Sequence, residues 1–173
     1  EVYAFRDSNV AHVVLGFPGA ALDSPDRFAL DVLVELLSAT HGRLRTRLGQ
    51  LGTSVSLEVF SFAGVDPGYV GVYLLCPPDT LEAAVRITRE ELTARSTQKR
   101  LERTALRAAR QRLVGRHELS LASQANLATA LALGEAEELG FAAAADYSRG
   151  VLTVSAADVR RVARTYLSWD RAV

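Results

Sequence analysis

The sequence predicts an α+β fold, an antiparallel β-sheet with helices packed on one face. Extended segments, a helix and a β-hairpin come first, and most of the remaining chain has helical composition. With 173 residues and 49% hydrophobic content, the chain can bury one core of its own. We therefore expect residues 1–173 to form a single domain, and its abrupt ends indicate a fragment of a longer protein.

The first strands and helix follow from local patterns. Residues 2–6 alternate in character and residues 11–17 form a nearly continuous apolar run, so both segments are predicted to be extended. A helix is predicted to start at Ser24, whose hydroxyl can cap it, with Pro25 in its first turn.

A β-hairpin is predicted next. Residues 53–62 alternate with a period of two, residues 64–68 have the composition of a turn, and residues 69–75 form the second apolar strand.

The rest of the chain is predicted to be helical. Capping-box spacing appears at Asp79 with Glu82 and again at Ser155 with Asp158, so each pair is expected to start a helix. The expected helices run from Asp79 to about Ala94, from Ser96 to about Arg112, from about Leu119 to Ala132, from Gly140 to Tyr147, and from Ser155 to a point before Trp169.

Composition excludes some partners. Twenty basic and twenty acidic residues cancel, and no run of about twenty apolar residues occurs, so neither nucleic acid nor a membrane is indicated as a partner. The single cysteine, Cys76, lies in an apolar strand and cannot form an internal disulfide, so a packing role is expected.

No catalytic motif is visible. His12, His41 and His117 are far apart, and the start of a His-Glu-x-x-His motif at His117 has Leu121 where the second ligand would stand. Neither a phosphate-binding glycine loop nor a nucleophile elbow is present. The chain alone is therefore predicted to be inactive, with no metal or cofactor of its own.

One alternative comes from a row of arginines. Arg100, Arg103, Arg107 and Arg110 share a predicted helix face, which would suit phosphate tracking by a nucleic-acid binder. Aromatic residues are absent from this face, so a solvated helix surface is the favoured interpretation.

The ordered motifs resemble one family. An apolar strand ending in Gly-Phe-Pro-Gly at residues 16–19 is followed by Gly-Arg-Leu at 42–44, Leu-Gly-Thr-Ser-Val at 51–55, and helices beginning near Leu81 and Leu101. Residues 153–167 close the series. In this order the pieces resemble the carboxy-terminal, inactive domain of pitrilysin/insulinase zinc metallopeptidases, which include mitochondrial processing peptidase and share a LuxS-like metalloenzyme fold.

The resemblance implies a helper role. Such a domain closes a substrate chamber over a catalytic domain, in the same chain or a partner chain, which holds zinc on a His-x-x-Glu-His motif and cleaves a peptide. Active relatives contribute an arginine and a tyrosine, seven residues apart, to the substrate backbone. Here the tyrosine position is Thr53, and the arginine would be Arg45 or Arg47, which flank Thr46.

Two interpretations stay open. The chain is either the substrate-chamber domain of a bacterial zinc metalloprotease or, because threonine replaces tyrosine at position 53, a structural or assembly subunit without protease support. The expected compartment is the bacterial cytoplasm or the periplasm and envelope. A final strand is expected to begin at residues 171–173.

Overall fold

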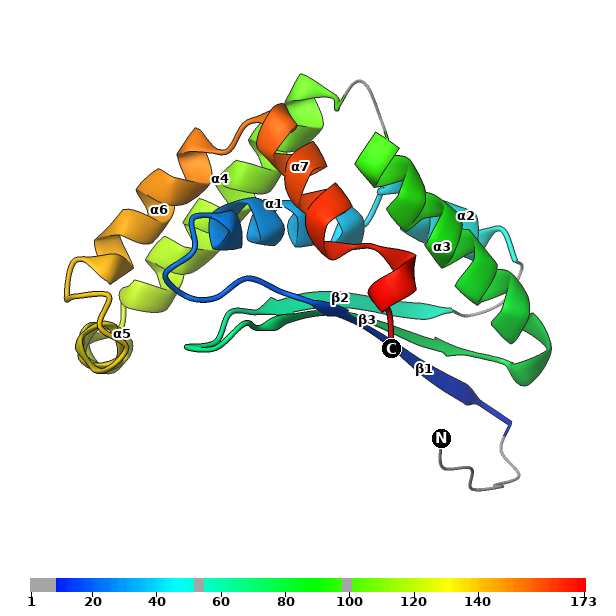
Figure 1. Ribbon diagram of the computed structural model, residues 1–173, viewed down its shortest axis with the longest axis horizontal. Helices are drawn as coiled ribbons and strands as arrows, with labels where there is room; N and C mark the ends of the chain where they lie inside the picture. The colour runs from blue at the N-terminus through cyan, green and yellow to red at the C-terminus, as the bar shows by residue number, and fades with distance from the viewer. Residues whose placement is uncertain (1–8, 52–54, 98–100) are drawn as a thin grey trace.

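A computed structural model describes residues 9–51, 55–97 and 101–173 of the chain. It consists of a twisted sheet with one layer of helices above it, and the opposite face of the sheet carries no helix in the described part of the chain (Figure 1). This arrangement confirms the predicted α+β class. The strand expected at residues 2–6 lies outside the described residues.

The sheet contains three described strands, β1 (Ala11–Pro18), β2 (Ser56–Phe62) and β3 (Tyr69–Cys76), in the order β1-β3-β2. Both pairings are antiparallel, and β2 and β3 form the predicted hairpin. Because side chains alternate along a strand, every second residue of β3 faces the helices, and Val70, Val72 and Leu74 are buried there.

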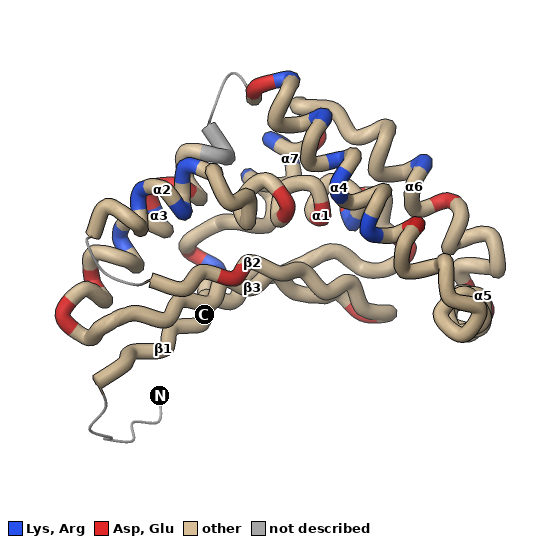
Figure 2. Tube along the Cα trace, turned by 180° about the vertical axis from the view of Figure 1, so that it is seen from behind, with Lys and Arg blue, Asp and Glu red and all other residues tan. Residues whose placement is uncertain are grey.

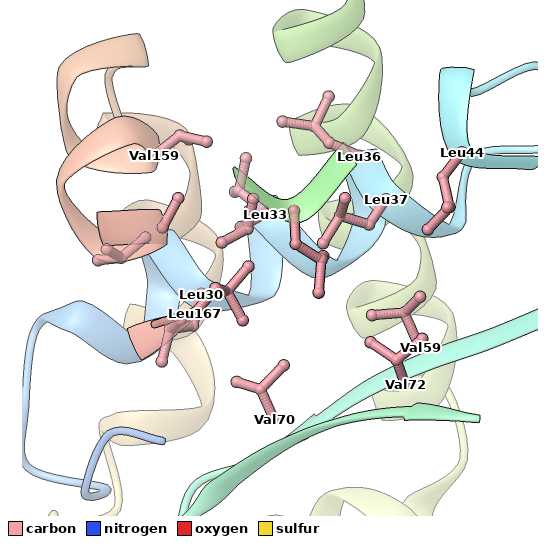
Figure 3. Packing of buried hydrophobic residues seen from close by; sticks show 14 of the residues in the cluster. Leu30, Leu33, Leu36, Leu37, Leu44, Val59, Val70, Val72, Val159 and Leu167 are labelled. Atoms are coloured by element: carbon pink, nitrogen blue, oxygen red, sulfur yellow. The ribbon is translucent and has the colours of Figure 1, made fainter. Parts of the chain in front are cut away.

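The core lies between this face and α1 (Asp26–Ser38), which crosses the sheet as the central helix (Figure 3). Leu33 and Val72 are fully buried at the centre, and Leu37 is 1% exposed beside them. Cys76 is also buried, which confirms its expected packing role. Helix α1 touches both the sheet and the outer helices, so it fixes their relative positions.

The other helical segments surround α1. They are α2 (Arg43–Gly49), the 3₁₀ turn η1 (Pro78–Thr80), α3 (Leu81–Thr97), α4 (Arg103–Leu121), α5 (Gln124–Ala136), α6 (Ala143–Thr153), α7 (Ala156–Tyr166) and the 3₁₀ turn η2 (Trp169–Arg171).

Several helix boundaries differ from the sequence-based expectation. The helix expected from Ser96 begins at Arg103 and continues past Gly115 to Leu121, so the next helix starts at Gln124 instead of Leu119. A helical glycine costs only about 1 kcal/mol relative to alanine, and the buried side of α4 outweighs that cost. Helix α6 likewise extends to Thr153, beyond the predicted end at Tyr147.

The two predicted capping boxes have different outcomes. Ser155 caps α7 as expected, because its hydroxyl accepts the N–H of Asp158 while the Asp158 carboxylate accepts the N–H of Ser155. At Asp79 the chain instead forms η1, and α3 begins only at Leu81. Ser24 also behaves as predicted in part, since its hydroxyl accepts the N–H of Asp26 at 3.2 Å.

The chain returns to the sheet at Val173. The N–H groups and carbonyls of Gly16 and Val173 exchange two hydrogen bonds, of 2.8 and 2.9 Å, which is the pattern of an antiparallel pair. Pairing beside β1 thus begins at Val173 and not at Arg171, which still belongs to η2.

Candidate functional site

The outer edge of β2 is covered by side chains from two helices. Arg45 of α2 donates from Nη2 to the carbonyl oxygen of Leu57 at 2.9 Å, and Ser38 of α1 donates from its hydroxyl to the carbonyl oxygen of Val59 at 3.2 Å. Residues 57 and 59 are two apart, so their carbonyls point toward the same side of the strand. The predicted site residue Arg45 therefore lies at a sheet edge.

One N–H group of Arg45 has no acceptor among the described residues. Its Nε is buried and has no hydrogen-bond partner among the residues that the structure describes. A buried N–H without an acceptor costs free energy.

Arg47 lies on another side of α2. Its guanidinium contacts Glu90 of α3 at 2.6 Å and the buried carboxylate of Glu91 at 3.1 Å, and Arg43 reaches Glu91 at 3.4 Å. The hydrogen bond from Arg47 lowers the pKa of the Glu90 carboxyl, and the reciprocal bond raises the pKa of Arg47. Arg47 therefore joins α2 to α3, and the structure does not bring it to the β2 edge with Arg45.

Thr53, the third predicted site residue, lies outside the described residues. The structure therefore describes Arg45 and Arg47 of the three: both lie on α2, but Arg45 contacts β2 and Arg47 contacts α3.

The histidines take part in separate contacts. His12 shares a 2.7 Å hydrogen bond with the Tyr73 hydroxyl on the open face of the sheet, and His117 Nε2 lies 2.6 Å from the carbonyl oxygen of Ala144. Glu118, next to His117, accepts a hydrogen bond from Ser148 at 2.6 Å, so this dipeptide joins α4 to α6. Within the described residues, no cluster of three or more His, Cys, Asp or Glu side chains could hold a metal ion.

One member of the arginine row, Arg110, turns inward to the carbonyl oxygen of Val154. Farther along the same helix, Arg112 and Arg116 both pair with Glu35 of α1, at 2.6 and 3.3 Å. Acidic and basic positions are interleaved over the helical layer (Figure 2). These contacts favour the structural interpretation of the row over phosphate tracking.

A hollow of about 610 Å³ lies between the end of α1 and the start of α4. Its walls include Glu35, His41 and Arg112, and neither Arg45 nor Arg47 lines it.

The sequence patterns did not point to Asp31, a partly buried carboxylate on α1. Asp31 accepts hydrogen bonds from the hydroxyls of Ser61 and Tyr147, both at 2.9 Å, and so links α1 to β2 and α6. Burial raises the pKa of the Asp31 carboxyl, although the hydrogen bonds from Ser61 and Tyr147 oppose this shift. The pKa of the Tyr147 hydroxyl is raised as well, by burial and by the nearby charge of Asp31. The sequence signal that could have identified Asp31 is its position between the apolar residues Leu30 and Val32.

The raised pKa of Asp31 predicts a pH dependence of stability. The folded state holds this proton more tightly than the unfolded state, so the stabilisation is complete below the unfolded pKa of about 4 and is lost as pH rises through the folded pKa. Relative to Asp31→Asn, the wild type should therefore lose stability as pH rises from about 4 to neutral, as measured by urea unfolding at several pH values.

Asp158→Asn is the matched control, with the opposite sign. The Ser155 hydroxyl lowers the pKa of Asp158, so its contribution is lost as pH falls. A difference between wild type and Asp31→Asn that stays constant with pH would contradict the assignment.

Solved structures share this architecture. The chain superposes on the inactive peptidase domain of a candidate zinc protease from Bordetella parapertussis with a TM-score of 0.85 at 21% identity, covering 99% of this chain and 94% of that one. It also matches a peptidase M16 inactive domain structure from Pseudomonas fluorescens, with a TM-score of 0.83 at 17% identity, covering 96% of this chain and 40% of that one. At these identities the likeness establishes the fold.

Sequence comparison gives the family. Residues 1–113 match the model of the peptidase M16 inactive domain, and because the match spans more than half of the chain, the chain belongs to this family. An uncharacterised zinc protease of Streptomyces coelicolor is 34% identical over 92 residues, which are 50% of this chain and 19% of that relative. The resemblance drawn from the ordered motifs is confirmed.

The relatives are bacterial proteins, and this chain corresponds to a minor part of the S. coelicolor protein. None of the helices in residues 9–51, 55–97 and 101–173 is long and apolar enough to cross a membrane.

Proposed function

We propose that this chain is the non-catalytic half of an insulinase-like zinc protease and closes a substrate chamber over a catalytic domain. Membership of the inactive-domain family is the observation that carries the proposal. The greater length of relatives such as the P. fluorescens chain supports a catalytic domain in the same polypeptide, and a separate partner chain would serve equally.

The β2 edge suits a peptide ligand. Extended peptides bind at sheet edges through main-chain hydrogen bonds. Here Arg45 lies at the edge, where its guanidinium holds the Leu57 carbonyl. We assign substrate contact to Arg45. Arg47, which pairs with Glu90 and Glu91 of α3, and Thr53 are the other two predicted positions of the same α2–β2 segment.

Zinc belongs to the catalytic partner in this proposal. The described residues of this chain do not form a ligand set, and no chemical step is assigned to them. A zinc ion in the partner would polarise the scissile carbonyl and activate water. This chain would contribute walls, a sheet edge and a guanidinium that orients the peptide.

A structural or assembly subunit is the second candidate. The contacts of Arg45 with Leu57 and of Arg47 with Glu90 and Glu91 favour it, because both guanidinium groups already hold elements of the fold together.

Peptide cleavage by the assembled pair separates the two candidates. If Arg45 contacts substrate, Arg45→Ala should lower kcat/KM by about 10- to 100-fold, the worth of a hydrogen bond from a charged group. Arg149→Ala is the control, because Arg149 is exposed and pairs with Asp146 in the same helix turn. Unchanged cleavage by a folded Arg45→Ala protein would favour the structural subunit.

A further inference from the structure

Helix α5 has an unusual composition for its position. Glu135 is the only charged residue between Gln124 and Ala136, and the remainder is mainly alanine and leucine. Leu127, Leu131 and Leu133 are nevertheless 39, 37 and 51% exposed. An apolar helix of this kind is normally buried on several sides, so the described fold leaves α5 without part of the cover that it requires.

The helix projects from one end of the molecule. Figure 1 shows α5 end-on, beside the far ends of α4 and α6 and away from the central helix α1. Gly134 is its only fully buried residue. Two exposed apolar residues flank the helix in the chain, Leu119 at 78% and Phe141 at 71%. We call the exposed leucines of α5, Leu127, Leu131 and Leu133, the α5 patch.

The α5 helix is held firmly at its carboxy-terminal end. The N–H groups of Leu139 and Gly140 both donate to the carbonyl oxygen of Gly134 at 2.9 Å, and Gly140 adopts a positive φ of 79°. A side chain at Gly134 would come within 2.7 Å of the Gly140 carbonyl oxygen. Because this close packing fixes the helix direction, the α5 patch is presented as a preformed surface.

We propose that the α5 patch is the surface through which this chain packs against the zinc-binding catalytic domain. The proposal rests on the proposed function and adds to it the place of contact. In the P. fluorescens structure and the S. coelicolor protein, the matched region is 40% and 19% of the chain, so in these relatives most of the polypeptide lies outside this domain and is available as cover.

The composition of α5 favours a protein partner over an anionic membrane or a nucleic acid. Helix α5 contains no arginine or lysine, and the acidic residues Glu135, Glu137 and Glu138 cluster at its end. Anionic lipid surfaces and nucleic acids attract basic segments and would be repelled here. Exposed leucines on a helix without basic residues fit an apolar protein surface.

Amide hydrogen exchange tests the proposal. Exchange of residues 124–136 is measured in this chain alone and in the presence of the insulinase-type catalytic domain from the same organism, either linked or as a separate protein. Slower exchange of α5 on association is expected, because burial suppresses the openings that allow exchange.

A double variant of α5 tests whether the α5 patch is needed for binding to the catalytic domain. Leu127 and Leu131 are four residues apart on one helix face, and replacing both by glutamate should weaken binding of the catalytic domain on the order of 100-fold. The melting temperature of the chain should barely change, since both side chains are already partly exposed. Leu152→Glu, at a 52% exposed position on α6, is the control and should leave binding intact.

The outcomes separate the two levels of the proposal. Association that leaves α5 exchange unchanged, or that tolerates the double variant, overturns the α5 patch and leaves the proposed function standing. Dimers of this chain alone with α5 protected would assign the patch to a second copy and overturn the proposal. Failure of the two domains to associate at all would overturn both.

Discussion

Replacing Leu33 by alanine is expected to lower the free energy of unfolding by about 2–5 kcal/mol. Leu33 is fully buried on α1, the helix that touches the sheet and the outer helices, and the shortened side chain would leave a cavity at the meeting point of these layers (Figure 3). Urea unfolding of wild type and variant measures the difference.

Leu152→Ala is the control for this experiment. Leu152 is 52% exposed, so its truncation should change stability by less than about 0.5 kcal/mol. A loss below about 1 kcal/mol for Leu33→Ala would mean that α1 does not occupy the centre of the core.

Gly19→Ala is expected to destabilise the fold by about 1–3 kcal/mol, because an added methyl group has no space. Its Cβ would lie 2.6 Å from the backbone nitrogen of Tyr69 and 2.8 Å from the carbonyl carbon of Gly68. Gly19 also donates its N–H to the Gly68 carbonyl at 2.8 Å, so the two backbones cannot separate without losing a hydrogen bond.

Gly115→Ala should have the opposite effect. Gly115 lies within α4, and a Cβ there meets nothing within 4 Å, so alanine should stabilise the helix by about 1 kcal/mol. Thermal unfolding of the two variants checks both signs. Equal melting temperatures would contradict the close approach at Gly19.

The Gly-Phe-Pro-Gly segment explains why the sequence was informative about the fold. A glycine that admits backbone at 2.6 Å is required by the geometry itself, so it leaves a visible motif. The hairpin and the Ser155 cap were also predictable, because the residues that signal them are close together in the sequence. The helix ends near Gly115 were not predictable. They depend on the burial of α4 against elements that are distant in sequence.

The candidate site could be predicted only in part. The family resemblance located Arg45 and Arg47, but a spacing of two residues along a helix does not say which one reaches a strand. In the structure Arg45 contacts β2 and Arg47 contacts α3, because their acceptors come from segments 12 and 43 residues away. Asp31 was missed because its partners Ser61 and Tyr147 are also distant in sequence.

Zinc content is the most direct test of the account. Elemental analysis after purification without added metal is carried out on this chain alone and on its assembly with the insulinase-type catalytic domain, alongside a peptide-cleavage assay. The account predicts no tightly bound zinc and no cleavage for this chain, and about one zinc per assembly together with cleavage. Stoichiometric zinc in this chain, or cleavage by it alone, would contradict the assignment of catalysis to the partner.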